Sequence, residues 1–196
     1  MGAIQSVLKN YLQPGTCKVK VTIMGLGGSG KTTILYRFLL NTVVNTIPTH
    51  GFNVETIHMN KVEFTFWDSS SRPLWRHYFA GTDAAIFVID SSDYGQFEEA
   101  KENIWRIFLS EENQYLASTL ALLVFANKQD LQSSMTVAEV KDALDLDSMP
   151  GFGSSGMRRW HVQGSSAITA EGLMEGMDWL AAQFKGDRSI PLSTGT

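Results

Sequence analysis

The segment of this sequence that most directly suggests chemistry is a glycine-rich run ending in a lysine and a threonine. Residues Gly25 to Thr32 match the pattern G-x-x-x-x-G-K-[ST] and lie between an apolar stretch and a helix-forming one. Such glycines let backbone N–H groups turn inward toward phosphate oxygens, and the positive end of the following helix strengthens the attraction. Lys31 adds a point charge for the terminal phosphates, and Thr32 offers a hydroxyl to Mg²⁺. The predicted phosphate-binding residues are Gly25, Gly27, Gly28, Ser29, Gly30, Lys31, Thr32 and Thr33.

A second polar motif, Asn127-Lys128-Gln129-Asp130, directly follows an apolar segment further along the chain. If that segment is a strand, the motif lies at the carboxyl edge of the sheet, where ligands of such folds bind. Asp130 can accept two hydrogen bonds, from the N1–H and the exocyclic amino group of guanine, whereas adenine offers neither donor there. Asn127 would tie this loop to its neighbours, and the Lys128 stem can lie over the base plane. The motif therefore predicts a guanine nucleotide.

The elements that must position these motifs alternate between β-rich and helical segments, which predicts an α/β fold with a mostly parallel sheet between helices. The two strands separated only by Asn60 and Lys61 should form an antiparallel hairpin at one sheet edge. The predicted strands are residues 19–24, 53–59, 62–67, 84–90, 120–126 and 160–163. The predicted helices are residues 31–40, 97–109, 137–144 and 173–184.

Length and composition limit the possible classes of protein. A chain of 196 residues suits one domain with a single sizeable core. Its formal net charge of -4 provides no basic field for nucleic acid, so we expect no nucleic-acid partner. The single cysteine, Cys17, excludes an intrachain disulfide and fits a reducing, cytoplasmic compartment. No apolar run is long enough to span a bilayer, and the first residues lack the features of a secretory signal.

These residues resemble the ADP-ribosylation factor (Arf) family of small GTPases over nearly the whole chain. The stretches that carry the resemblance are Gly30-Lys31-Thr32-Thr33-Ile34-Leu35-Tyr36, Ile47-Pro48-Thr49, Gly51-Phe52-Asn53-Val54-Glu55, Arg72-Pro73-Leu74-Trp75-Arg76-His77-Tyr78-Phe79, residues 127–131 and Glu175-Gly176-Met177-Asp178-Trp179-Leu180. The resemblance implies a P-loop NTPase of the small-GTPase fold, with six strands, helices on both faces and an amphipathic N-terminal helix. It divides the chain into an N-terminal helix and linker (1–16), a GTPase domain (17–185) and a flexible tail (186–196).

The resemblance also implies roles for further residues. Thr49 corresponds to the switch I threonine that ligates Mg²⁺ with GTP bound, and Asp68 to the switch II aspartate that reaches the metal through water. Ser166, Ala167 and Ile168 correspond to the third guanine loop, whose backbone contacts the base oxygen. The family's exposed aromatic cluster, which meets effectors and exchange factors, corresponds to Phe52, Trp67 and Tyr78. The alternative for these aromatic residues is ordinary core packing.

The start of the chain fits an N-myristoylation pattern with Gly2 as the acceptor and Ser6 at the preferred position. Ile4, Val7, Leu8, Tyr11 and Leu12 would share one helical face and could lie in a membrane interface. One acyl chain gives only reversible attachment, which suits a switch. The alternative is a helix that packs on the domain. In the family both occur: the helix packs on the domain with GDP bound and is released to the membrane with GTP bound.

One departure from the family concerns switch II. Between Asp68 and Arg72 only Ser69, Ser70 and Ser71 are present, where family members typically carry Val-Gly-Gly-Gln-Asp-Lys-Ile. The missing glycine senses the γ-phosphate, and the missing glutamine orients the attacking water. We therefore name no catalytic residue and expect very slow GTP hydrolysis.

The resemblance implies a molecular switch that binds GTP or GDP with Mg²⁺ and recruits effectors to membranes in vesicle-mediated transport. Its partners would be an exchange factor, a GTPase-activating protein, effector or coat proteins, and a membrane surface. We expect a cytoplasmic monomer that associates reversibly with the Golgi or another endomembrane. Two alternatives remain open: a pseudo-GTPase scaffold held in one nucleotide state, and a P-loop phosphotransferase, against which the motif at residues 127–130 argues.

Overall fold

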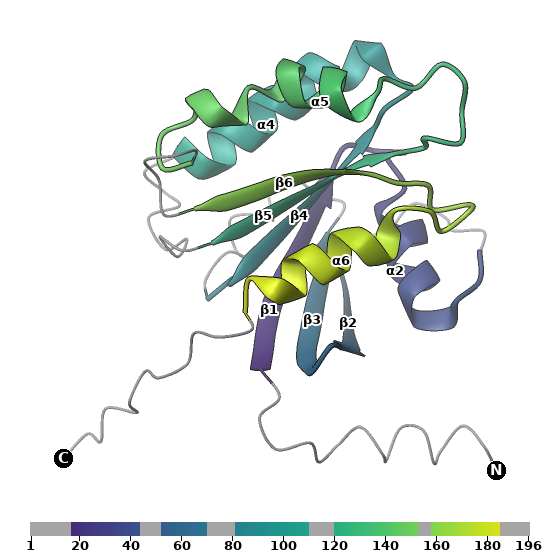
Figure 1. The fold of residues 1–196 in the computed structure, drawn as a ribbon, viewed down its shortest axis with the longest axis vertical. Helices are drawn as coiled ribbons and strands as arrows, with labels where there is room; N and C mark the ends of the chain where they lie inside the picture. Colours follow the sequence, from purple (N-terminus) through teal and green to yellow (C-terminus); the bar gives the residue numbers. More distant parts are fainter. Residues whose placement is uncertain (1–16, 44–51, 70–80, 110–119, 153–157, 185–196) are drawn as a thin grey trace.

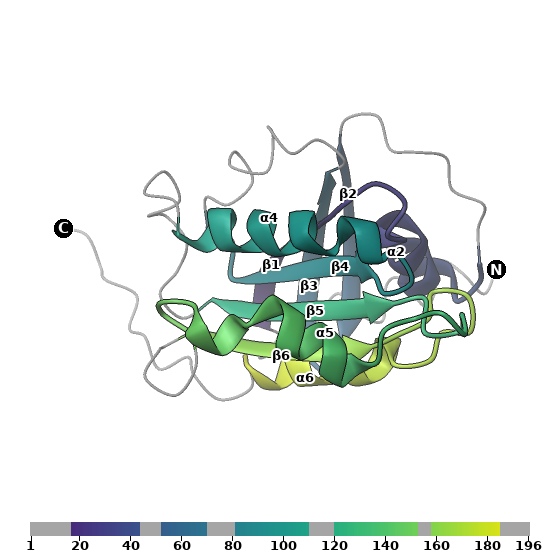
Figure 2. The same ribbon diagram turned by 90° about the horizontal axis from the view of Figure 1, so that it is seen from above.

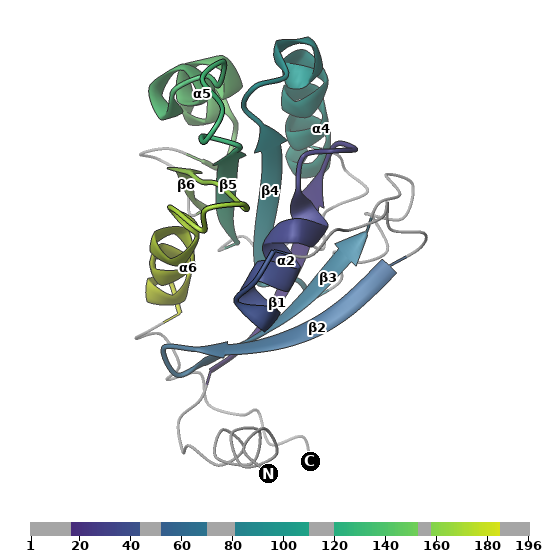
Figure 3. The ribbon, with the colours of Figure 1, turned by 90° about the vertical axis from the view of Figure 1, so that its right-hand side faces the viewer.

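A twisted, six-stranded sheet with helices on both faces forms the centre of the molecule (Figure 1). The computed structural model describes residues 17–43, 52–69, 81–109, 120–152 and 158–184. Along the sheet the strands follow the order β2-β3-β1-β4-β5-β6, which Figure 3 shows from the side. The prediction of a mostly parallel sheet with one antiparallel edge hairpin is confirmed, because among the described strands only β2 and β3 pair antiparallel.

Strands β1, β2, β3 and β6 extend one or two residues beyond their predicted ranges at one or both ends, β4 has its predicted bounds, and β5 is shifted by one residue. The strands are β1 (Cys17–Gly25), β2 (Phe52–Met59), β3 (Val62–Ser69), β4 (Ala84–Asp90), β5 (Ala121–Asn127) and β6 (Arg159–Gly164). Ladder pairing continues into polar residues at the strand ends, since backbone groups need partners whatever side chain they carry. Asn127 is therefore the last residue of β5, in register with Asp90 of β4, and not the first residue of the loop.

The helices cover the sheet in two layers. Figure 2 shows α4 and α5 running over the strands on one side, and α2 and α6 cover the other side. The α-helices are α2 (Lys31–Leu40), α4 (Phe97–Leu109), α5 (Val137–Leu144) and α6 (Leu173–Ala182); short 3-10 helices are η1 (Tyr94–Gln96) and η3 (Leu146–Ser148). The last helix ends at Ala182, two residues before its predicted end, although Phe184 still packs against the core. Within the described ranges, the helices are too short or too polar to cross a bilayer.

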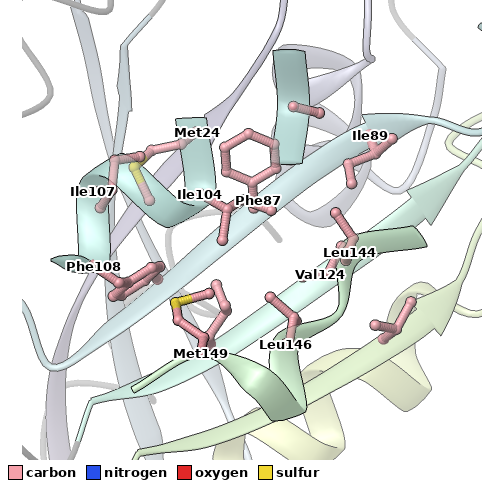
Figure 4. Packing of buried hydrophobic residues seen from close by; sticks show 14 of the residues in the cluster. Met24, Phe87, Ile89, Ile104, Ile107, Phe108, Val124, Leu144, Leu146 and Met149 are labelled. Atoms are coloured by element: carbon pink, nitrogen blue, oxygen red, sulfur yellow. The ribbon is translucent and has the colours of Figure 1, made fainter. Parts of the chain in front are cut away.

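Each face of the sheet has its own buried core because side chains alternate along every strand. On one face Phe87 and Val124 meet Ile104 of α4 and Leu144 of α5, as the close view in Figure 4 shows. On the other face the neighbouring strand residues Ile86 and Leu123 pack with residues of α2 and α6. The two cores fix the position of the carboxyl ends of β1, β4 and β5, where the predicted motifs lie.

The helices next to these strand ends begin in different ways. Helix α5 starts with a capping box, in which the Thr136 hydroxyl accepts from the Glu139 N–H and the Glu139 carboxylate accepts from the Thr136 N–H. Helix α2 follows Gly30, which has no side chain to cap it. The partial positive charge at the start of α2 favours an anion there.

A glycine inside α6 provides a test of this packing. An added Cβ at Gly176 would lie 2.5 Å from Cε1 of the buried Phe125. Glycine to alanine in a helix interior usually stabilises, by up to about 1 kcal/mol. Here we expect Gly176→Ala to destabilise the protein instead, by about 1–3 kcal/mol, because the ring cannot move aside in a packed core. Denaturant unfolding measures this; Glu175→Ala, at an exposed neighbouring position, should change stability by less than about 0.5 kcal/mol.

Candidate functional site

The glycine-rich loop joins β1 to α2, and two of its glycines are required by the backbone. Gly25 has φ 142°, and a Cβ there would collide with the carbonyl oxygen of Val88. Gly30 has φ 96°, and a Cβ there would collide with the side-chain amide of Asn127. At Gly27, by contrast, a Cβ would meet nothing within 4 Å. The loop therefore follows a path that only glycine permits at its two ends, and it is open in the middle.

Lys31 lies folded over this loop. Its ammonium donates to the carbonyl oxygen of Leu26 at 2.7 Å, and the residue is only 8% exposed. Burial lowers the pKa of Lys31, and the charge of nearby Asp68 partly opposes this effect. The Leu26 carbonyl also accepts from the Ser29 hydroxyl at 3.0 Å. Burial removes the water that would otherwise solvate the ammonium. A polyanionic ligand compensates for this loss with its negative charge, so a buried ammonium at a helix N-terminus favours such a ligand.

Thr32 and Asp68 lie beside this ammonium, although they come from α2 and β3. The Thr32 hydroxyl donates to Oδ2 of Asp68 at 3.0 Å. Asp68 is 0% exposed, and its Oδ1 has no hydrogen-bond partner among the described residues. Burial raises the pKa of Asp68, while the Thr32 hydrogen bond and the charge of Lys31 act in the opposite direction. A hydroxyl and an unpaired carboxylate oxygen are the hard oxygen donors that Mg²⁺ prefers, so these two residues fit that cation.

Asn127 connects the glycine-rich loop to the rest of the site. Its amide nitrogen donates to the carbonyl oxygen of Ser29 at 2.8 Å. Its amide oxygen accepts from the backbone N–H of Ala167 at 3.0 Å and from the Ser165 hydroxyl at 3.4 Å. The side chain is 1% exposed. Three segments far apart in the sequence thus meet at one amide, as predicted for a residue that ties this loop to its neighbours.

Lys128 is held at its backbone and at its side-chain end. Its φ of 68° lies in the left-handed region, and its carbonyl accepts from Leu131 N–H at 3.0 Å and from the Ser134 hydroxyl at 2.6 Å. Its ammonium forms an ion pair with Oδ2 of Asp90. Burial works to raise the pKa of Asp90, but the hydrogen bonds from Lys128 and Ser92 outweigh it and lower this pKa. The carboxylate is therefore charged at neutral pH.

The remaining predicted guanine-binding residues are Asp130 and the loop of residues 166–168, which Asn127 contacts through the Ala167 N–H. Asp130 is exposed at the end of its motif, and Ile168 is 56% exposed. Ser166 is buried, and its hydroxyl accepts from the N–H groups of Ile168 and Thr169 at 3.2 and 3.1 Å. Because the Ala167 N–H already donates to Asn127, a base oxygen would share that donor.

Other predicted residues are described in part or lie outside the described residues. Trp67 is half-buried, so it is neither core nor freely exposed, and the ammonium of Lys20 lies 5.2 Å from its ring centre. The backbones of Phe52 and Ser69 pair with each other at the end of the β2–β3 hairpin. Outside the described residues lie Gly2, Thr49, Ser70, Ser71 and Tyr78.

The sequence reasoning did not single out Asp90. As the last residue of a predicted strand, it offered one signal: the carboxyl ends of parallel strands gather at one sheet edge. Its contact with Lys128 depends on β4 and β5 being neighbours, which no local pattern reveals.

The fold and the site define a P-loop nucleotide-binding protein, in which a glycine loop, a lysine and a guanine-type motif meet at the carboxyl edge of a mostly parallel sheet. The model of the ADP-ribosylation factor family matches residues 4–184, and the chain belongs to this family of small GTPases. It is similar to the Arl6 (BBS3) small GTPase from Trypanosoma brucei, solved with a bound nucleotide analogue, GppNp, at 32% identity. That match has a TM-score of 0.70 and covers 84% of this chain and 96% of the other.

Proposed function

We propose that this protein is a guanine-nucleotide switch that binds GTP or GDP with Mg²⁺ and recruits effectors to a membrane. The observation that carries the nucleotide part is the pair of contacts made by Asn127, to Ser29 of the phosphate loop and to Ala167 beside the base. One nucleotide can therefore touch both ends of the site. Its phosphates would meet the α2 N-terminus and Lys31, and its guanine would meet the Asp130 carboxylate.

In this proposal Thr32 and Asp68 hold Mg²⁺, together with Thr49 in the GTP state. When bound, the cation neutralises charge on the phosphate oxygens. The residues of the chain do the rest: Lys31 neutralises the phosphates, the loop N–H groups orient them, and the Lys128 stem covers the base. Family membership supports this assignment of roles, and the unpaired Oδ1 of Asp68 is the local observation that favours it.

Membrane recruitment is the part of the proposal that depends on the family and on the sequence pattern at the start of the chain. Gly2 would carry a myristoyl group, and residues 1–16 would bind the surface of the Golgi or another endomembrane from the cytoplasm. Exchange factors, activating proteins and effectors or coat proteins would meet the switch segments, with Phe52, Trp67 and Tyr78 as their aromatic contacts. The half-buried Trp67 ring is compatible with this role.

The test is a titration with GDP, GTP and ATP, followed by analysis of the products. We expect tight binding of both guanine nucleotides, weak binding of ATP, and single-turnover GTP cleavage slower than the roughly 10⁻⁴ s⁻¹ of unaided Ras. The reason is that the three residues Ser69, Ser70 and Ser71 replace the seven-residue family segment that holds the γ-phosphate-sensing glycine and the water-orienting glutamine. Cleavage at or above the Ras rate would contradict this expectation.

A gain-of-function variant also tests whether the short segment after Asp68 is the cause of slow GTP cleavage. Replacing Ser69, Ser70 and Ser71 by Val-Gly-Gly-Gln-Asp-Lys-Ile should raise the single-turnover rate constant, with little change in the affinity for GDP. If this variant stays as slow as the unchanged protein, the short segment is not the cause of slow cleavage.

The second candidate is a pseudo-GTPase scaffold that stays in one nucleotide state. The three serines after Asp68 favour it, because the family's glycine, whose N–H senses the γ-phosphate, and its glutamine are missing there. Equal affinities for GTP and GDP, with one of them always co-purifying, would support the scaffold; different affinities would support the switch.

A further inference from the structure

We infer that Asp90 is a positioning residue for the nucleotide base: its carboxylate holds the ammonium of Lys128, so that the lysine stem is already placed to cover guanine. This inference rests on the proposed function, because it gives a further residue a part in the same site. Asp90 acts through Lys128 and has no contact with the base itself.

The carboxylate of Asp90 is fixed on both of its oxygens. Oδ1 accepts from the Ser92 N–H at 3.0 Å and from the Ser92 hydroxyl at 2.6 Å, whereas Oδ2 pairs with the Lys128 ammonium. The side chain is 14% exposed, against 33% for Lys128. Because the Ser92 contacts orient the carboxylate, its second oxygen points to one place.

The position of Asp90 also follows from the pairing of β4 with β5. It ends β4 in register with Asn127 of β5, and the Ser91 N–H donates to the Asn127 carbonyl at 3.0 Å. The Met135 N–H donates to the Ser91 carbonyl at 2.8 Å, so the far end of the guanine-type loop is tied to the same turn. The backbones of Asp90 and Lys128 therefore stay next to each other as long as the loop stays on the sheet.

A free lysine side chain has many rotamers, and a ligand that uses its stem must restrict them on binding. Here the carbonyl of Lys128 is fixed by Leu131 and Ser134, and its ammonium is fixed by Asp90. Between these two points lies the methylene stem, which in the proposed function covers the base. The ion pair thus reduces the entropy that binding would otherwise lose, which corresponds to about two- to ten-fold in affinity for one ordered side chain.

A structural role for the ion pair is the competing explanation, and a double-mutant cycle separates the two. Asp90→Asn keeps the size of the side chain and one oxygen for Ser92, but it removes the charge that holds Lys128. Lys128→Met keeps an unbranched stem and removes the ammonium. Dissociation of a fluorescent GDP is measured from the unchanged protein, from both single variants and from the double variant.

Asp90→Asn alone should raise the dissociation constant for GDP by about two- to ten-fold. In the Lys128→Met background the same change should have less than about a two-fold effect, since no ammonium is left to position. An effect of equal size in both backgrounds would overturn the inference, and so would no effect in the unchanged protein.

The matched control is Asp93→Asn in the same turn, whose carboxylate accepts from the Gln96 side chain at 2.6 Å. We expect this variant to bind GDP like the unchanged protein; a weakening as large as that of Asp90→Asn would point to a general disturbance of the turn and overturn the inference. Failure of the proposed function would look different. In that case the unchanged protein itself would show no preference for GDP over ADP.

Discussion

Asp130→Asn is expected to abolish the preference of this protein for guanosine over adenosine nucleotides. The carboxylate would accept two charge-assisted hydrogen bonds from guanine, each contributing about 1.5–3 kcal/mol, so we expect GDP affinity to fall about a hundred- to ten-thousand-fold. Binding of ADP should change little, because adenine has no donor at these positions. Competition of GDP and ADP against a fluorescent guanine nucleotide measures both affinities. An unchanged ratio would mean that Asp130 does not contact the base.

Loss of folding could also produce a fall in GDP affinity. Measuring the binding of xanthosine diphosphate to the variant distinguishes the two causes. Xanthine has a carbonyl where guanine has its amino group, and the asparagine amide can donate to that oxygen. The variant should therefore bind xanthosine diphosphate more tightly than the unchanged protein does. A variant that binds none of the three nucleotides would indicate that the loop no longer folds. The exposed position of Asp130 makes that outcome unexpected.

Gly30→Ala should nearly eliminate nucleotide binding, for a reason that involves both halves of the site. Alanine at φ 96° carries about 1–3 kcal/mol of backbone strain, and its Cβ would collide with the Asn127 amide. Displacing that amide breaks its hydrogen bonds to Ser29 and Ala167. We expect GDP and GTP to bind at least about a hundred-fold more weakly, as measured by calorimetry.

Gly27→Ala is the matched control for this variant. It adds the same methyl group to the same loop, at a position where a Cβ meets nothing within 4 Å and φ is not in the left-handed region. Its affinity for GDP should stay within about two-fold of the unchanged protein. If both alanine variants fail alike, the loop requires glycine for close approach of the phosphates, and the collision with Asn127 is not the main reason.

Most elements of the fold could be predicted because their patterns are local. The helices at 31–40, 97–109 and 137–144 begin and end where the sequence pattern predicts. Strand ends were less accurate: β1 begins at Cys17 and β3 ends at Ser69, beyond their apolar stretches. The ladder of backbone hydrogen bonds decides where a strand ends, and the partner strand, not the side chain, supplies that ladder.

The site was predictable in its residue types and not in its contacts. The glycine pattern predicted the turn between β1 and α2. Asn127 was expected to tie loops together, which its bonds to Ser29 and Ala167 confirm. The ion pair of Asp90 with Lys128 was missed, because it depends on which strands are neighbours.

By itself, the sequence determined the order of the motifs, the side chains that carry their chemistry, and the glycine-rich run that lets the loop turn. These properties belong to short segments, whose preferences act before any tertiary contact forms. The tertiary structure alone decided that the Thr32 hydroxyl meets Asp68, that Asn127 reaches Ser29, and that Asp90 holds Lys128. The physical reason is that β1 lies between β3 and β4, with β5 beside β4, and this order brings their carboxyl ends to one edge.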